Sequence, residues 1–431
     1  MSNQLFKEFE PVSEKAWKQK IQVDLKGKDY NKTMLTSTDE GIDIKPFYHL
    51  DSHQKLNIPS PQQWLITEKI TGDDIKNIEQ RQSKGTEAFW IKSNKQPKQI
   101  KLPLILEVEE PQNFKFESKE NLIYKFDPIH NLAQSGNWVN TQKQDLDLYQ
   151  NFFSITHSIS IDARLYHNSG ANITQQLAYT STHLYSYFKE LDFSQTKTLQ
   201  IHIFCSVGPN YFFEIAKLKA FRVLVNTICK HQDVDYKLNI ISEPGLHHMS
   251  IYDYNVNMLR SATECMSAVL GGSDFVCNIA YDKIFKTKND FSQRIARNQL
   301  LILKNESYFD KVSNASDGSY YIDHLTNALS EKALELFKSI EKSGGLIQQM
   351  FDGKIQEKID QQFEKSLKQF ENKSLKLVGV NIFENEDDHM KKQIEKDIFP
   401  KKQKRKTLLK PITERRIAEQ LEQQKLAQEN A

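Results

Sequence analysis

The residues that could do chemistry in this sequence are few, and their spacing argues against most kinds of site. His247 and His248 could suggest a metal site, but adjacent histidines on a loop point in different directions and no acidic third ligand is spaced to help. Phe212, Phe213 and Phe221 lie at helical spacing, which is typical of core or interface residues rather than of platforms for stacked bases. The sequence contains no Walker loop, dinucleotide-binding glycine pattern or nucleophile elbow. We therefore predict no metal site.

Composition argues against a nucleic-acid or membrane partner. The 431 residues include 58 basic and 56 acidic side chains, and the net charge of +2 is too small to steer the whole molecule to a phosphate backbone. No run approaches eighteen consecutive apolar residues, and the first residues lack the pattern of a secretory signal. The cysteines lie in apolar runs without the close spacing of a zinc or redox site, at Cys205, Cys229, Cys265 and Cys277. We expect a soluble, cytoplasmic protein whose cysteines are buried and reduced.

Short β-type runs alternate with helical patterns from about Thr86 to Ile347, the rhythm expected of a parallel sheet wrapped by helices. The expected strands span residues 87–93, 102–109, 121–127, 157–164, 199–206, 237–243 and 275–282, with a shorter eighth near Lys311. Seven or eight such units predict an α/β fold that closes into a (β/α)8 TIM barrel. Any chemistry in that fold would lie at the carboxyl ends of the strands, which form the mouth of the barrel.

The two ends of the chain have weaker core patterns. Residues 1–80 contain scattered apolar residues and a turn-rich stretch, so we expect an extended N-terminal arm. Residues 81–383 hold the barrel pattern, and residues 384–431 are expected to form a polar, helical C-terminal tail with a basic run.

Several blocks of sequence resemble the barrel of the methylmalonyl-CoA mutases. The most specific region runs from Arg260 to Leu329 and contains RSATECMSAVLGGSDFVCNIAYD, DFSQRIARNQLLILKNES and DGSYYIDHLTNAL in that order. Further matches are NYFFEIAKLKAFR, YHNSGA with the following QQLAY, and LVGVN. Near the amino end, Trp17, DLKGKDY and GIDIKPFY are similar to the opening of the family's barrel chains. The resemblance covers almost the whole chain and is most specific in its second half.

The resemblance implies a radical rearrangement between methylmalonyl-CoA and succinyl-CoA with adenosylcobalamin as cofactor. A catalytic chain of the family combines a barrel that threads the CoA ester with a C-terminal cobalamin domain, which carries the motif Asp-x-His-x-x-Gly. The approximation here is Asp387, His389 and Lys392, with lysine at the glycine position and fewer than fifty residues after it, too few for a doubly wound domain. We therefore expect this chain to bind no cofactor and a partner subunit to carry adenosylcobalamin.

The expected barrel mouth also departs from the catalytic pattern that the resemblance implies. An arginine expected at the acyl carboxylate is replaced by Gln200. The histidine that would polarise the thioester carbonyl falls at Ile241, with Glu243 two residues later, and a tyrosine of the catalytic chains falls near Lys69. Tyr166 and His167 could also border the mouth. A packed or surface role is the more ordinary interpretation of both residues. These replacements predict a vestigial mouth without a catalytic residue.

The leading hypothesis is the small structural subunit of a heterodimeric methylmalonyl-CoA mutase, which supports propionate metabolism through a large, cobalamin-binding catalytic subunit. The resemblance implies that the amino end wraps that partner, with Phe6, Phe9 and Trp17 as aromatic anchors. The alternative is the catalytic barrel of a split acyl-CoA mutase whose cobalamin subunit is a separate chain. A weaker third hypothesis is a CoA-ester-binding module that regulates its partner.

Overall fold

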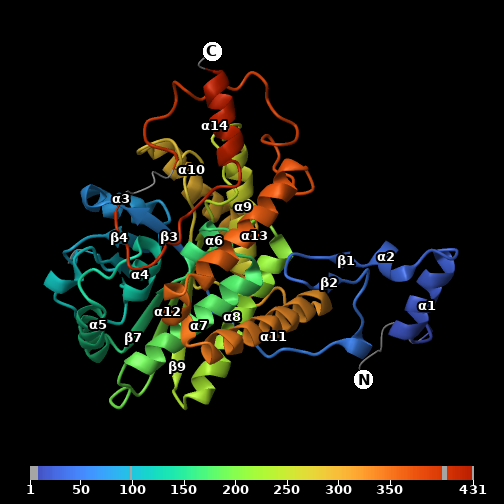
Figure 1. Ribbon diagram of the computed structural model, residues 1–431, viewed down its shortest axis with the longest axis horizontal. Helices are drawn as coiled ribbons and strands as arrows, with labels where there is room; N and C mark the ends of the chain where they lie inside the picture. Colours follow the sequence, from blue (N-terminus) through green and yellow to red (C-terminus); the bar gives the residue numbers. More distant parts are fainter. Residues whose placement is uncertain (1–7, 98–99, 400–404, 430–431) are drawn as a thin grey trace.

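The computed structural model describes residues 8–97, 100–399 and 405–429. At its centre, eight parallel strands form a nearly closed barrel with helices around it (Figure 1). The barrel strands are β3 (Leu65–Ile70), β4 (Ala88–Lys92), β5 (Leu104–Glu107), β6 (Leu122–Lys125), β7 (Ser158–Asp162), β8 (Leu199–Val207), β9 (Tyr236–Pro244) and β10 (Phe275–Cys277). The predicted (β/α)8 TIM barrel is therefore confirmed.

The α-helices alternate with these strands and extend the chain at both ends. Those in and around the barrel are α3 (Ile78–Ser83), α4 (Pro128–Ser135), α5 (Gln142–Thr156), α6 (Arg164–Asn168), α7 (Ile173–Glu190), α8 (Tyr211–His231), α9 (Val256–Leu270), α10 (Asp290–Leu301), α11 (Tyr320–Lys342), α12 (Gly345–Phe351) and α13 (Lys354–Glu371). The terminal helices are α1 (Glu14–Asp24), α2 (Tyr30–Met34) and α14 (Glu419–Gln428). None of the described helices is long and apolar enough to cross a membrane.

Alternate residues of each strand point into the barrel or out toward the helices. The parallel register places Lys69 beside Trp90, and Trp90 beside Ile105. The interior is an apolar cluster of Ala88, Trp90, Ile105, Ile123, Phe204, Ile241, Phe275 and Cys277. Residues of the opposite parity, such as Ile201 and Ile203, pack in the larger core between the sheet and the helices. The barrel interior is thus a packed core rather than a pore.

The barrel closes through side chains between β6 and β7. The strand order runs β6-β5-β4-β3-β10-β9-β8-β7, and no ladder between the two end strands is found in the described chain. Across this seam the Ser160 hydroxyl donates to the Tyr124 carbonyl, and the Asp162 N–H donates to Asp127 Oδ2 at 2.8 Å. Polar side chains therefore replace the missing backbone ladder.

The predicted eighth strand near Lys311 is wrong. Residues 307–319 lie in turns and bends, and the missing strand is β3 (Leu65–Ile70), which pairs with both β4 and β10. This strand was hard to recognise because Glu68 and Lys69 interrupt its apolar pattern. Glu68 is buried only because ion pairs with Arg81 and Arg297 compensate its charge. The barrel sheet therefore begins before residue 81, within the range expected for the arm.

The first part of the chain projects away from the barrel. It carries α1, α2 and a small antiparallel hairpin of β1 (Thr36–Ser37) and β2 (Asp43–Ile44), all drawn in blue at one side of Figure 1. Helix α1 has no buried residue. Residues 8–44 therefore form an extension beside the barrel, which we call the arm.

The last part of the chain crosses the carboxyl-end face of the barrel before α14. Backbone N–H groups of Ile412, Arg415 and Ile417 donate to carbonyls of α4, of α6 and of the loop after β9, at 2.8, 2.8 and 2.9 Å. Arg416 and Glu422 form a buried ion pair at 2.6 Å beneath this crossing segment. The predicted helical segment of the tail is present as α14, and the non-helical segment before it packs against the loops that surround the mouth.

Candidate functional site at the barrel mouth

Charged side chains converge where the barrel strands end. They come from β3, β5, β6, β7, β9 and the first residue of α6, and they are Lys69, Glu107, Lys125, Asp162, Glu243 and Arg164. We call this set the mouth network. It contains three cations and three anions, so its formal charge is zero.

Arg164 is the hub of the mouth network. Its Nε and Nη2 donate to the two carboxylate oxygens of Asp162 at 2.7 and 2.6 Å, and its Nη1 donates to Glu243 Oε1 at 2.5 Å. Lys69 donates to the other oxygen of Glu243. The two-pronged contact with Asp162 matches the planar fork of a guanidinium, which lysine could not reproduce.

The network continues on the other side of Asp162. Lys125 Nζ lies 3.0 Å from Asp162 Oδ2 and 3.4 Å from Glu107 Oε1. The indole of Trp90 donates to Glu107 Oε2 at 3.2 Å, and Lys69 Nζ lies 3.8 Å from the centroid of the Trp90 ring. Trp90 therefore separates the charged layer from the apolar interior and contacts a cation through its ring face.

Burial and pairing shift the pKa values of the network together. Burial by itself would raise the pKa of Glu243, but Lys69 and Arg164 hold this pKa well below its ordinary value. The pKa of Asp162 is likewise held well below its usual range, because Arg164 and Lys125 outweigh burial. The same pairing raises the pKa of Arg164. Both acids and the guanidinium are therefore charged at neutral pH, and each already has a partner.

Lys69 and Glu243 are the two predicted mouth residues that the structure brings together. Ile241 lies deeper in the same barrel and packs in its apolar interior at 1% exposure. Gln200 is not a mouth residue: it lies at the amino end of β8, about 20 Å along the strand from Val207 at the other end. The nine-residue length of β8 explains the discrepancy, since the residue next to Glu243 at the mouth is Ser206.

Tyr166 and His167 are buried in α6 behind the mouth network. The Tyr166 hydroxyl lies 3.3 Å from His183 Nδ1 and is packed rather than exposed to a cavity. The His167 ring faces the rings of His247 and His248, with centroids 6.4 and 6.1 Å away. Neither residue has an ion-pair contact with the mouth network in the described chain. They are packed residues, the more ordinary of the two interpretations.

The histidine group beside Gly245 does not form a metal centre. A Cβ on Gly245 would lie 2.2 Å from His167 Nε2, so the bare backbone there makes room for the ring. His247 Nδ1 contacts the Arg415 carbonyl at 2.8 Å, and burial lowers the pKa of His247 to about 4. Within residues 8–97, 100–399 and 405–429, no group of three or more His, Cys, Asp or Glu side chains is arranged to hold a metal ion.

The four cysteines are buried and unpaired, as predicted. Burial raises the pKa of Cys205 and of Cys277 to about 11, and that of Cys229 to about 12. These thiols are therefore protonated at neutral pH and are poor nucleophiles or metal ligands.

The surroundings of His389 do not fit a cobalt-binding motif. Asp387 is exposed in a turn and His389 is exposed two residues later, while Asp388 between them accepts from the Asp253 N–H at 2.5 Å. A lower cobalt ligand needs an oriented histidine in a cradle that holds the corrin, and an exposed turn supplies neither.

Most of the mouth network was missed by sequence reasoning. Glu107, Lys125 and Asp162 are each the last residue of a barrel strand, and Arg164 lies two residues after Asp162. Charged residues that end consecutive parallel strands meet at one face of a barrel, so this repeated strand-end pattern was the available signal.

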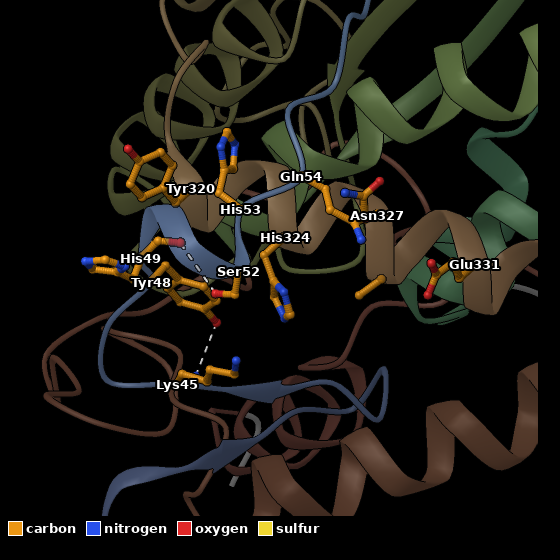
Figure 2. Close-up of a pocket in the computed structure, with 11 residues that line it drawn as sticks. Lys45, Tyr48, His49, Ser52, His53, Gln54, Tyr320, His324, Asn327 and Glu331 are labelled. Carbon is orange, nitrogen blue, oxygen red and sulfur yellow. Dashed lines mark hydrogen bonds between the residues drawn. The ribbon is translucent and has the colours of Figure 1, made fainter. Parts of the chain in front are cut away.

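A separate polar cleft lies at the base of the arm, between residues 45–54 and α11. Figure 2 shows His49, His53 and His324 around it, and its volume is about 220 Å³. His53 Nε2 lies 2.7 Å from Asp323 Oδ2, a contact with both side chains largely buried. The ring of Tyr48 packs on His324 at 5.0 Å. These contacts anchor the base of the arm to its own barrel.

Comparison with known proteins agrees with this architecture. The family model described as methylmalonyl-CoA mutase matches residues 93–430. The chain is 29% identical over 403 residues to the methylmalonyl-CoA mutase small subunit of Porphyromonas gingivalis. The aligned region covers 80% of this chain and 65% of that protein. It is 33% identical over 210 residues to methylmalonyl-CoA mutase of Rhizobium meliloti, covering 46% of this chain and 29% of that protein.

The large subunit of Porphyromonas gingivalis methylmalonyl-CoA mutase is also similar, at 30% identity over 206 residues. This match covers 46% of the chain and 29% of that protein. The chain spans less than two thirds of the length of these relatives. Because the family model covers well over half of the chain, the chain belongs to the methylmalonyl-CoA mutase family.

Proposed function

We propose that this chain is the small, structural subunit of a heterodimeric methylmalonyl-CoA mutase. The observation that carries the proposal is the mouth network, because it fills the end of the barrel at which chemistry occurs in this fold. Its charges are mutually paired, and the apolar interior of the barrel lies directly beneath it.

A mutase barrel needs groups that orient the acyl part of its substrate. A carboxylate is oriented by a cation that is free to bind it, but Lys69, Lys125 and Arg164 already have carboxylate partners within the barrel. Withdrawing Arg164 would leave the buried Asp162 and Glu243 with only Lys125 and Lys69 as cationic partners, which is unfavourable. The arrangement therefore favours a supporting role over turnover by this chain.

The cofactor of the proposed complex is adenosylcobalamin, held by the large subunit. Cobalamin supplies the radical chemistry when it is bound there. In this chain the exposed turn around His389 supports the proposal that no cobalamin is bound. We place the complex in the cytoplasm, where the four buried thiols would remain reduced.

The arm is the proposed contact with the large subunit. Phe9 is 67% exposed and Trp17 is 45% exposed, while Phe6 lies outside the described residues. Trp17 stacks on Phe47 with ring centroids 4.4 Å apart, so one face of the indole is supported by the arm itself. An aromatic ring held in place on one face and exposed on the other is suited to act as an anchor in an interface.

The test is co-purification of the tagged chain with a cobalamin-binding large mutase subunit. We expect a stable one-to-one complex whose bound corrin absorbance stays with the large subunit when the two are separated. The chain alone, mixed with adenosylcobalamin and desalted, should retain no corrin absorbance. Formation of succinyl-CoA by this chain with a separate cobalamin domain would instead support a split acyl-CoA mutase.

A further inference from the structure

A basic cavity lies beside the mouth network, and we propose that it binds the phosphate or diphosphate group of a small molecule. The cavity lies between the end of β3, the segment after β10 and helix α10, and its volume is about 260 Å³. Lys69 is part of the cavity lining, and its side chain is 31% exposed, more than any other side chain of the mouth network. This inference does not depend on the proposed subunit role.

The charge of the cavity lining is strongly positive. The cationic side chains that line it are Lys69, Lys283, Lys286, Lys288, Arg297 and Lys396. The acidic side chains of the lining are Glu68 and Asp282. The cations come from β3, the segment after β10, α10 and the tail, so they approach one space from several directions.

Four of these six cations have acidic partners. Their closest contacts are Lys69 with Glu243, Lys286 with Glu395 at 2.8 Å, Lys288 with Asp74 at 2.7 Å, and Arg297 with Glu68 at 3.3 Å. Glu68 is shared between Arg297 and Arg81, so this one carboxylate serves two guanidinium groups.

Lys283 and Lys396 form no ion pair within the part of the chain that the structure describes. They are neighbours, because Lys396 Nζ donates to the Lys283 carbonyl. The nearby Asp282 uses its Oδ2 to accept from Asn289 at 2.7 Å. Two lysines without an ion-pair partner among the described residues therefore line the cavity, and a bound dianion could pair with both.

The electrostatics around Lys283 are consistent with a missing anion. Burial is the main cause that lowers the pKa of Lys69 to about 8. The negative charge of Glu243 opposes this shift, whereas the positive charges of Arg164 and Lys283 add to it. Burial and Lys283 also lower the pKa of Lys396, although Asp282 opposes them. The cations of the cavity thus repel one another in the absence of a ligand.

Arg297 brings a guanidinium to the lining of the cavity. Its side chain is 8% exposed, and its Nε has no acceptor among the described residues. A guanidinium matches the geometry of phosphate oxygens, and lysines add charge without a directional requirement. A tetrahedral phosphate can accept from donors on several sides at once, which a planar carboxylate does less well. These features favour a phosphate group over a carboxylate.

The experiment uses the full chain and inorganic pyrophosphate, with inorganic phosphate and ADP as parallel probes at constant ionic strength. We expect saturable one-to-one binding by calorimetry, with pyrophosphate tighter than phosphate. Lys283→Gln should weaken pyrophosphate binding by about tenfold, because it removes a charge-assisted contact. Tighter binding of ADP than of pyrophosphate would identify a nucleotide as the source of the diphosphate, and the reverse would identify a smaller phosphorylated ligand.

The matched control is Lys237→Gln, since Lys237 is exposed near the amino end of β9, at the opposite end of the barrel. It should leave binding unchanged. Lys396→Gln provides a second test on a more exposed position, with circular dichroism to verify folding of each variant. Non-saturable stabilisation that sulfate and chloride reproduce, or equal affinity in Lys283→Gln, Lys396→Gln and wild type, would overturn the proposal.

Discussion

The barrel mouth and the N-terminal arm distribute their interactions in opposite ways. At the mouth, Asp162 and Glu243 are 1% and 7% exposed, and cations of the same chain satisfy both. In the arm, α1 buries no residue, and Phe9 and Val23 are 67% and 71% exposed. The comparison teaches that the charges of the mouth are satisfied within this chain, whereas the arm leaves large apolar side chains exposed.

Removing the arm should have the largest effect on assembly and almost none on the fold. Deletion of residues 1–28 removes α1, which buries no residue, and leaves both the buried Ile42 and the contact of His53 with Asp323 in place, so the barrel should keep its thermal unfolding temperature. Complex formation with the large subunit should be lost in size-exclusion chromatography of the co-expressed chains. Full co-elution, or unfolding of the truncated chain in circular dichroism, would contradict the difference between the two regions.

Breaking the mouth network should have the largest effect on stability. Arg164→Ala leaves the buried carboxylates of Asp162 and Glu243 without their main partner, and this should lower the free energy of unfolding by about 3–5 kcal/mol. Urea denaturation measures the change. Lys92→Ala removes the exposed pair of Lys92 with Glu109 and should cost less than about 1 kcal/mol. Equal effects of the two variants would show that the mouth network is not a buried, coupled unit.

A single change in the arm should weaken assembly to an intermediate extent. Trp17→Ala removes the exposed face of the ring and should reduce the affinity for the large subunit by about 2 kcal/mol, or roughly thirtyfold. Lys20→Ala in the same helix is the control, because its pair with Asp24 is exposed on both sides. Surface plasmon resonance with immobilised large subunit measures both constants. An unchanged constant for Trp17→Ala would remove Trp17 from the interface.

The smallest expected effect is a pH dependence of the free energy of unfolding that comes from the buried carboxylate of Glu243. Because the folded-state pKa of Glu243 is lowered, its contribution to stability is present above its unfolded pKa and is lost as pH falls through the acidic range. Glu243→Gln should therefore be less stable than wild type at pH 7, and the difference should shrink below about pH 5. Glu109→Gln, on an exposed pair, is the control and should lower the free energy of unfolding by less than about 1 kcal/mol at pH 7. A difference that stays constant down to pH 3 would argue against a charged Glu243.

The sequence predicted the barrel well because its strands are apolar and evenly spaced. Seven strands were located, and the eighth, β3, was missed because Glu68 and Lys69 look like loop residues until their partners are known. Of those partners, Arg81 lies in the helix after the strand, whereas Arg297 and Glu243 come from distant parts of the chain. A pattern of neighbouring residues cannot contain this information.

The mouth was predicted only in part for a related reason. Lys69 and Glu243 were identified, but their direct pair and the link of Glu243 to Arg164 depend on closure of the barrel. The error at Gln200 arose because alignment fixed a position in β8 but not which end of that nine-residue strand it occupies. Strand length and register, rather than residue type, decide which side chains reach the mouth.

The seam between β6 and β7 should also be the place where the barrel sheet first opens in local unfolding. Every other neighbouring pair of barrel strands is held by a ladder of backbone hydrogen bonds, whereas this junction depends on Ser160 and Asp162. Native-state hydrogen exchange should therefore detect the earliest opening of the sheet along this line, with amides of β6 and β7 losing protection before those of β8 and β9. The barrel would behave as a rolled sheet with one preferred line of opening, and not as a ring of equivalent strands.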